Sequence, residues 1–488
     1  MTGLTRRQVL ARAGAGAATL ALPGALAACG GSGGSAATPA STDEWKQFAG
    51  TTINFISENT APTSAIAANV KPFTDLTGIN VKFSQLELSA LVQKVALDFA
   101  SGIGAYDVVY ADPYQILAPY HKALAPLNEF NDDPNLPKIQ DLADFIPTQL
   151  DAAGRFVDRK TIYTLPYDAP TLIWMYRKDI FQKHRGRMQQ DLGFDPMPNA
   201  NSTWEQYYAI SKWIRKNASH DVPYGSGHQA KQHDSLMNDF SNVLWAYGGD
   251  YFNNGTEVGR FGSDNPGEPL LDRPEAMQAA DMYQRLISVA HPGSKSWDWD
   301  GLGEAFAAGQ VAMAPEWHEF AASFEASKTV AGKVGYAPLP KGPKRRADMY
   351  GGTGIGVNAV SPKDKQKAAW LFVNWATSPK TQLANLKSKV GGGTPTRESI
   401  YKLPEVRKAR NPPSKMPNVL TTDAVFEAWK PENIGLRPKI AAWNECDTVI
   451  FTELSKMIAG SQSPEQCMRN AKSGFVDAID RAAVLRRQ

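Results

Sequence analysis

Asp107-Val108-Val109-Tyr110-Ala111-Asp112 is the stretch that decides the fold of this chain. Its apolar, β-branched middle predicts a short strand buried on both faces, as in a parallel sheet. Strands at 51–57 and 81–85 and helices at 62–77 and 88–99 are expected before it. The second of these helices repeats apolar residues at helical spacing. The order strand, helix, strand, helix, strand predicts an open α/β sheet.

Polar residues follow two of these strands at the ends where α/β sheets bind ligands. Glu58 and Asn59 come directly after the first strand, and Asp112 and Tyr114 come after the third. We therefore predict these four residues at a ligand site. Helix capping is the alternative role for Asp112 and Tyr114.

The rest of the chain continues the mixture of helices and strands. A capping box, Ser202-x-x-Glu205, predicts the start of a helix through Ile214, and Ser361-Pro362 is expected to begin another. Further extended segments are expected at 162–168, 172–176, 310–314 and 351–357, and further helices at 300–306, 440–459 and 464–483. If the last two helices pack antiparallel, Cys446 and Cys467 lie too far apart for a disulfide, so we expect two buried thiols.

The first 29 residues have the order of a secretion signal. Arg6 and Arg7 precede an apolar run that is too short to span a bilayer, and Leu26-Ala27-Ala28-Cys29 ends it. The paired arginines resemble a twin-arginine export signal, and the ending resembles the bacterial lipobox, in which the cysteine is lipidated. The alternative is a cytoplasmic protein with a chance apolar N-terminus. Residues 30–42 are rich in Gly, Ser, Ala and Thr, and predict a flexible tether.

The charge of the chain gives no reason to expect a nucleic-acid partner. The full chain has a formal net charge of +3. Residues 1–28 contain Arg6, Arg7 and Arg12, so the mature chain has 49 basic and 49 acidic residues. Binding to a phosphate backbone requires a basic face, which this balance does not favour.

A series of motifs in one order resembles a known family. The motifs are Leu165-Pro166-Tyr167 running into Trp174-Met175-Tyr176-Arg177-Lys178-Asp179, then Leu244-Trp245-Ala246-Tyr247-Gly248-Gly249, Gly309 to Trp317, Gly351 to Asn358, and Gly460-x-x-Ser463-Pro464-Glu465. Behind a lipobox, this series resembles extracellular solute-binding protein family 1, the carbohydrate-binding lipoproteins of ABC importers of the maltose-binding type.

The resemblance implies a periplasmic-binding-protein-like fold of type II, with two α/β lobes around a cleft. It implies a signal peptide at 1–28, a lipidated (palmitate-bearing) Cys29 with a tether to 42, lobe one at 43–163 and 352–402, and lobe two at 164–351 and 403–488. It further implies a monomer without cofactor, metal or catalytic activity. This monomer would be anchored to the outer face of the cytoplasmic membrane, and would deliver a sugar or polyol to a membrane permease.

The resemblance also implies site residues, because aromatic faces and hydrogen-bonding groups bind sugars. Trp317 matches the family's sugar-stacking tryptophan, and Gly352 and Thr353 offer backbone N–H groups at the hinge. The other candidates flank these motifs or follow the crossovers between lobes: Tyr167, Asp168, Trp245, Glu316, His318, Arg397, Arg437 and Trp443. Core packing is the alternative role for the tryptophans, and solvated surface for the arginines.

Departures from the family pattern leave other functions open. Pro170 stands where the maltose-binding protein has an acidic ligand residue, and Ala111 replaces an aromatic residue. The ligand therefore need not resemble maltose. An exported glycoside hydrolase could use Asp112 and Glu316 as its two carboxylates. A metal-ion carrier could use the adjacent tyrosines Tyr207 and Tyr208, and a purely structural surface lipoprotein is the third alternative.

Overall fold

The computed structural model describes residues 44–485. The predicted signal, Cys29 and the tether lie outside the described residues, and remain predictions. Residues 44–485 belong to one compact unit of the chain. No helix within this range is both long enough and apolar enough to cross a bilayer.

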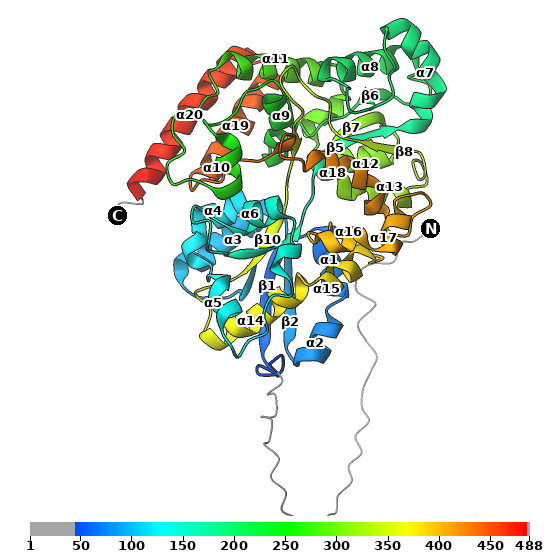
Figure 1. The fold of residues 1–488 in the computed structure, drawn as a ribbon. Helices are drawn as coiled ribbons and strands as arrows, with labels where there is room; N and C mark the ends of the chain where they lie inside the picture. Colours follow the sequence, from blue (N-terminus) through cyan, green and yellow to red (C-terminus); the bar gives the residue numbers. More distant parts are fainter. Residues whose placement is uncertain (1–43, 486–488) are drawn as a thin grey trace, which may run out of the picture. The chain divides into compact units, whose positions relative to one another are not determined.

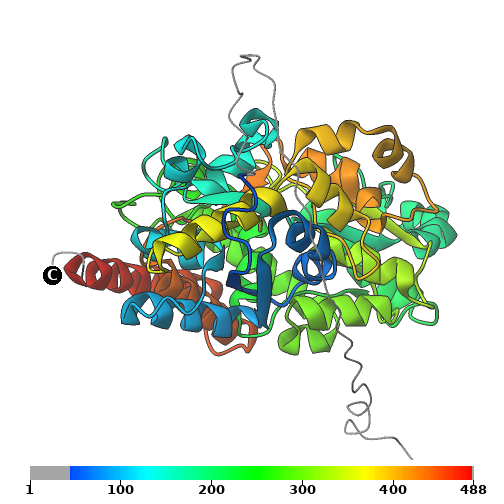
Figure 2. The same ribbon diagram turned by 90° about the horizontal axis from the view of Figure 1, so that it is seen from below.

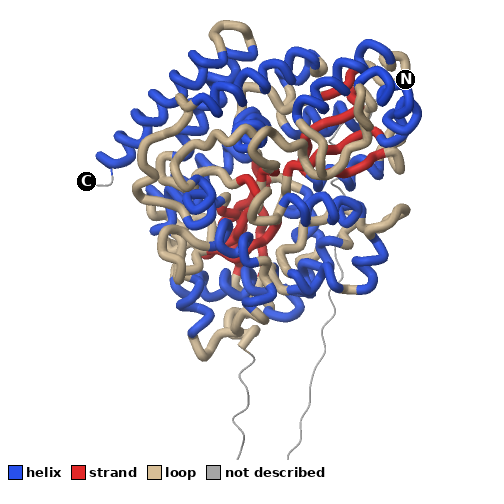
Figure 3. The backbone as a smooth tube through the Cα atoms, turned by 45° about the horizontal axis from the view of Figure 1, so that its top comes forward, coloured by secondary structure: helices blue, strands red, loops and turns tan. Residues whose placement is uncertain are grey.

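Two main sheets and one short pair of strands organise the described residues (Figures 1 and 3). The strands are β1 (Thr52–Glu58), β2 (Asn80–Leu86), β3 (Val108–Ala111), β4 (Thr164–Asp168), β5 (Leu172–Arg177), β6 (Tyr224–Ser226), β7 (Val311–Trp317), β8 (Val334–Ala337), β9 (Asp348–Met349), β10 (Thr353–Val357) and β11 (Ile434–Gly435).

The main helices surround these sheets. They are α1 (Ala61–Ala68), α2 (Lys71–Thr77), α3 (Leu88–Ser101), α4 (Ala118–Tyr120), α5 (Leu127–Asp132), α6 (Pro147–Gly154), α7 (Lys178–Leu192), α8 (Trp204–Asn217), α9 (Asp234–Ala246), α10 (Gly255–Phe261), α11 (Pro274–Val289), α12 (Trp299–Ala307), α13 (Ala321–Ala326), α14 (Lys363–Ala376), α15 (Pro379–Leu386), α16 (Glu398–Lys402), α17 (Pro404–Ala409), α18 (Thr422–Ala428), α19 (Trp443–Ile458) and α20 (Pro464–Leu485).

The first sheet has the strand order β2-β1-β3-β10-β4. β1 is parallel to both β2 and β3, as the sequence predicts, whereas β10 is antiparallel to its neighbours β3 and β4. The sheet includes β4, which the predicted boundary at 163 places in lobe two. Its core joins β1 to α14, where the Phe55 and Phe372 rings lie 5.6 Å apart. Seen from below, α14 (yellow) lies beside the first strands (dark blue), which it contacts (Figure 2).

The second sheet has the order β6-β7-β5-β8. β5 is antiparallel to β7 and β8, and β6 is parallel to β7. The chain passes from the first sheet to the second through the short segment between β4 and β5. It returns between β9 and β10, and Thr171 pairs with Tyr350 where these two segments meet. The ends of strands from both sheets therefore lie close together.

Three local predictions are corrected by the structure. The helix expected at 62–77 is two helices, because Pro72 in the first turn of α2 cannot donate the backbone hydrogen bond that a continuous helix needs. The capping box of α8 is Thr203 with Gln206, one residue later than predicted. Ser361 does not cap α14, because its hydroxyl donates to Asp107 instead (2.9 Å). Cys446 and Cys467 are buried free thiols.

Candidate ligand-binding site

One cavity of about 670 Å³ is lined by residues from both sheets. The first sheet contributes residues at the ends of β1, β3, β4 and β10. The second sheet contributes the end of β7, and the helices α9 and α12 contribute residues near their starts. A cavity of this size is typical of small-molecule sites. The cavity therefore lies where the sequence predicts the site, at the carboxyl ends of strands.

A chain of hydroxyl groups connects the first-sheet wall of the cavity. The Thr353 hydroxyl donates to the Tyr110 hydroxyl (3.1 Å), which in turn donates to Glu58 Oε2 (2.9 Å). The pKa of Glu58 is raised to about 8: burial is the largest cause, the hydrogen bond from Tyr110 opposes it, and the nearby carboxylates of Asp112 and Asp234 add to it. Glu58 is thus a carboxyl group held where its negative charge is unfavourable.

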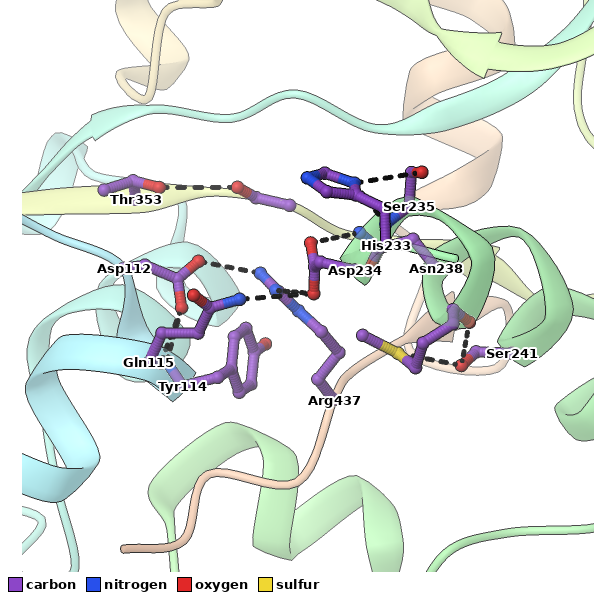
Figure 4. Close-up of polar contacts among 12 residues, drawn as sticks. Asp112, Tyr114, Gln115, His233, Asp234, Ser235, Asn238, Ser241, Thr353 and Arg437 are labelled. Carbon is purple, nitrogen blue, oxygen red and sulfur yellow. Dashed lines mark hydrogen bonds and ion pairs between the residues drawn. The ribbon is translucent and has the colours of Figure 1, made fainter. Parts of the chain in front are cut away.

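A buried arginine connects the first-sheet wall to α9 (Figure 4). Arg437 Nη2 donates to Asp112 Oδ2 (2.8 Å), and its Nη1 lies 3.9 Å from Asp234 Oδ1. Gln115 Nε2 donates to the same Asp234 oxygen (3.2 Å). Burial opposes the charge of Arg437, but attraction to Asp112 and Asp234 outweighs it and raises the pKa of the guanidinium. The arginine therefore remains a cation.

Asp112 has both of the roles considered from the sequence. Its Oδ1 accepts from the backbone N–H groups of Tyr114 (2.9 Å) and Gln115 (2.8 Å), which caps the short helix Pro113–Leu117. Its Oδ2 pairs with Arg437 and the residue lines the cavity. Tyr114 lies behind this pair, with its ring 4.2 Å from the Arg437 guanidinium carbon. It supports the arginine by a cation–π contact.

Two tryptophans give the cavity its aromatic surface. Trp317 ends β7 and Trp299 begins α12, and both are half-buried and line the cavity. Gly351 lies against the Trp317 ring: a Cβ atom added there would lie 2.6 Å from the indole. The glycine therefore leaves the space that the ring occupies.

A second polar group lies where the crossovers meet. The carboxyl groups of Asp168 and Glu319 hydrogen-bond to each other, and Asp168 Oδ1 also accepts from the Thr394 backbone N–H (2.6 Å). Burial raises the pKa of Asp168 to about 6, and burial with repulsion from Asp168 raises that of Glu319 well above its ordinary value. One proton is therefore shared by the two carboxyl groups.

His318 supports this group from behind the cavity wall. Its Nδ1 accepts from the Thr171 backbone N–H (3.1 Å), so the proton of the neutral ring is on Nε2, which donates to the Thr394 hydroxyl (2.7 Å). That hydroxyl donates to Glu319. Burial lowers the pKa of His318 to about 3. The histidine is a neutral positioning group and does not line the cavity.

The structure brings six of the predicted site residues together around the cavity: Glu58, Asn59, Asp112, Asp168, Trp317 and Thr353. Arg437, a further candidate from the sequence, joins them. The remaining candidates do not line it: Tyr114, Tyr167, Trp245, Glu316, His318, Gly352, Arg397 and Trp443.

Three of these remaining candidates are core aromatics. Tyr167 packs edge-on against Phe55 in the first core. Trp245 and Trp443 lie in the second core, at 2% and 0% exposed. All three are therefore packed in a core, which is the alternative role considered from the sequence. The spacing of apolar residues in the sequence does not distinguish a face that packs in a core from one that lines a cleft.

The polar candidates outside the cavity have structural partners. The Arg397 guanidinium donates to the carbonyls of Thr377 and Gln140 and lies 3.6 Å over the Phe145 ring, so it holds loops together. Glu316 is buried beneath Trp317 and accepts from its backbone N–H (2.8 Å). At Gly352, an added Cβ would lie 1.9 Å from the Tyr350 ring, so this glycine serves close packing.

Sequence reasoning missed several cavity residues: Tyr110, Asp234, Asn238, Trp299 and Glu319. Asp234 and Asn238 are four residues apart and so share one face of α9, which is buried along its whole length. Polar residues at this spacing on a buried helix are a signal that could have identified them. The others have no comparable signal in the sequence.

The geometry bears on two of the alternative functions. Asp112 and Glu316 do not face a common cavity, since Glu316 is fully buried, and this pair cannot act as the two carboxylates of a glycosidase. Within residues 44–485, no group of three or more His, Cys, Asp or Glu side chains is placed to hold a metal ion. Tyr207 is buried in the second core, away from the cavity.

Comparison with known proteins identifies the family. The family model described as "bacterial extracellular solute-binding protein" matches residues 57–383. The chain belongs to this family. The predicted recognition and the predicted fold class, a type II periplasmic-binding-protein fold, are confirmed.

Individual relatives are distant but cover most of the protein. A probable amino-acid ABC transporter periplasmic-binding protein of Sinorhizobium fredii is 25% identical over 438 residues, 86% of this chain and 88% of its own. The erythritol/L-threitol-binding protein of Mycolicibacterium smegmatis is 24% identical, with 82% of each chain covered. A solute-binding protein of Agrobacterium radiobacter, solved with ribitol, has a TM-score of 0.71 at 23% identity, covering 89% of this chain and 100% of that one.

Proposed function

We propose that this solute-binding protein captures a carbohydrate or polyol in the cavity and delivers it unchanged to the membrane permease of an ABC importer. The observation that carries the proposal is one cavity whose wall combines Trp317 and Trp299 with Arg437 and carboxylates from both sheets. Aromatic faces bind the C–H faces of sugars, and charged groups hydrogen-bond their hydroxyls. The erythritol/L-threitol and ribitol named for two similar proteins support this class of ligand.

The proposed mechanism is closure of two lobes on the ligand. Lobe one comprises about 43–163 and 352–402 together with β4 of the first sheet, and lobe two, built on the second sheet, comprises the rest of about 164–351 and 403–488. Closure excludes water, which strengthens the hydrogen bonds between ligand and cavity wall. The pairing of Thr171 with Tyr350, where the segments between the sheets meet, supports a hinge at these residues. The protein acts as a monomer without cofactor or catalytic step.

Calorimetry tests the ligand class. The protein without its signal is titrated with sugars, polyols and glycosides, and each ligand is recovered afterwards. We expect saturable binding of one ligand per chain, with the ligand recovered intact. Turnover of a glycoside, or no binding of any compound in the panel, contradicts the proposal.

The export part of the proposal rests on the sequence. Arg6 and Arg7 would direct the folded protein to the twin-arginine route, and lipidated Cys29 would anchor it to the outer face of the cytoplasmic membrane. We expect Cys29→Ala to release the protein from membranes and to abolish its labelling with palmitate. Replacing both arginines with lysine should block export; unchanged export would point to the general secretion route.

A further inference from the structure

The wall of the cavity carries more acidic than basic side chains. Six carboxyl groups line it: Glu58, Asp112, Asp168, Asp234, Asp300 and Glu319. Of the three basic residues, Lys389 and Lys415 are solvent-exposed. Among the described residues, Arg437 is thus the one buried cation of the wall, and its side chain is 4% exposed.

Arg437 is already paired. Its guanidinium lies between Asp112 at 2.8 Å and Asp234 at 3.9 Å, and the Tyr114 ring covers it. Two carboxylates balance this one positive charge, so none of it remains for the other acidic groups. The cavity therefore keeps a surplus of negative charge beside the arginine.

Glu58 adds to this surplus only when it loses its proton, because its pKa is raised to about 8. Within residues 44–485, the Glu58 carboxyl group accepts a hydrogen bond from a neutral donor, the Tyr110 hydroxyl (2.9 Å), and has no ion-pair partner. Burial and the neighbouring carboxylates of Asp112, Asp234 and Glu87 all disfavour its charge. A cation beside Glu58 would stabilise its charged form and so favour release of this proton.

Asn238 provides an independent indication of what the cavity accepts. It is 2% exposed and lines the cavity, and its Nδ2 donates to Asp234 Oδ2 (2.9 Å). Its Oδ1 is buried and has no hydrogen-bond partner in the structure. A buried acceptor without a donor costs free energy, so the wall is short of hydrogen-bond donors at this point. Figure 4 shows Asn238 beside Asp234, which lies next to Arg437.

From these contacts we infer that the ligand carries a protonated amine among its hydroxyl groups, as an amino sugar or aminopolyol does. An ammonium group supplies three donors and no acceptor, which fits an acidic wall that is short of donors, and its charge balances the surplus. A hydroxyl supplies a single donor, brings an acceptor of its own, and leaves the charge unbalanced. The inference rests on the proposed function, because it specifies the ligand of the same cavity.

Matched pairs of compounds test the inference by calorimetry. The pairs are D-glucosamine with D-glucose, 1-amino-1-deoxysorbitol with sorbitol, and the glucosamine disaccharide with cellobiose, at about pH 6.5, where the amines are protonated. We expect the ammonium member of at least one pair to bind ten times or more tightly than its hydroxyl partner. Added salt should weaken the ammonium compound more than the hydroxyl compound.

Two variants locate the effect. Glu58→Gln keeps the shape of the side chain and should reduce the preference for ammonium at least fivefold. Glu304→Gln is the matched control, since Glu304 is exposed on α12 and does not line the cavity, and it should leave the preference unchanged. Thermal melting confirms that both variants are folded.

The outcomes separate this inference from the proposed function. Binding of hydroxyl compounds as tight as, or tighter than, that of their ammonium partners overturns the inference and leaves the proposed function standing. An ammonium preference that Glu58→Gln leaves intact overturns the role given to Glu58. No binding of any compound overturns both.

Discussion

At the scale of single residues, Gly351 determines where the Trp317 ring can lie. Trp317 ends β7 and lines the cavity, and the space for its indole exists because residue 351 has no side chain. A methyl group there would contact the ring at 2.6 Å, which is closer than van der Waals contact allows. The sugar-stacking role proposed for Trp317 thus depends on Gly351, which lies in the segment between β9 and β10.

Trp317→Ala tests the stacking role. Stacking is worth about 0.5–1.5 kcal/mol beyond buried area, so we expect ligand affinity to fall by more than about threefold, with the melting temperature little changed. Calorimetry with the best ligand of the panel measures the effect. A loss of less than threefold contradicts the assignment.

Gly351→Ala should have a related but indirect effect. The added methyl displaces the indole, so affinity is expected to fall about threefold or more even though residue 351 offers no hydrogen-bonding side chain. Gly186→Ala is the matched control: it lies in α7 with no atom within 4 Å of the added Cβ, and should raise stability by up to about 1 kcal/mol. Equal affinities for Gly351→Ala and the wild type would show that the ring position does not matter.

At the scale of elements, one buried lysine joins two helix ends. Lys439 is 0% exposed, and its Nζ lies within hydrogen-bond distance of the carbonyl oxygens of Asp151 (3.1 Å), Ala152 (2.7 Å), Arg155 (2.6 Å) and Arg260 (2.7 Å). These carbonyls lie in the last turns and at the C-cap of α6 and α10, where the helix leaves carbonyl groups without a partner; the Asp151 carbonyl also accepts from the Arg155 N–H (3.4 Å). α6 packs on β4 of the first sheet, and α10 contributes Val258 to the second core.

Lys439→Met should therefore destabilise the fold. It leaves several buried carbonyls without a donor, and we expect the free energy of unfolding to fall by about 2–4 kcal/mol. Chemical denaturation measures this loss. Lys94→Met, at an exposed position of α3, is the control and should change stability by less than about 0.5 kcal/mol. Similar midpoints for the two variants would exclude the role given to Lys439.

The elements themselves were largely predictable, and the exceptions have local causes. Apolar periodicity predicted β1 and α3, and a continuous apolar run predicted β3, because each element buries apolar residues that its own sequence specifies. The break between α1 and α2 was missed although Pro72 signals it. The antiparallel insertion of β10 between β3 and β4 was not predictable from spacing, because its partners lie more than 180 residues earlier in the chain.

At the scale of the whole molecule, the buried carboxyl groups make stability depend on pH. Burial raises the pKa of Glu58 to about 8 and that of Asp168 to about 6, and that of Glu319 is also raised. The folded protein therefore keeps protons that the unfolded chain releases, so stability is lost as pH rises. His318 acts in the opposite direction: burial lowers its pKa from 6.5 to about 3, so its contribution is lost as pH falls below 6.5.

We expect the melting temperature to fall between about pH 6 and pH 8.5, because the pKa of Glu58 is raised to about 8 and those of Glu316, Glu319 and Asp447 are raised well above their ordinary values. These carboxyl groups outnumber the groups whose pKa is lowered, His291, His318 and Lys439. Glu319→Gln removes one of these groups and should make the dependence shallower, whereas the exposed Glu304→Gln should leave it unchanged. Thermal melts across this range measure both slopes. A melting temperature that rises with pH contradicts the expectation.

The sequence by itself determined the α/β class, the family and part of the site. Glu58 and Asp112 were predictable because the carboxyl ends of neighbouring parallel strands meet at one edge, whatever the rest of the chain does. The packing of α9 and of the segment before α19 against that edge brings three further residues to it: Asp234, Asn238 and Arg437. Only the tertiary structure decided which candidates face the cavity, because burial depends on residues from both sheets and not on local spacing.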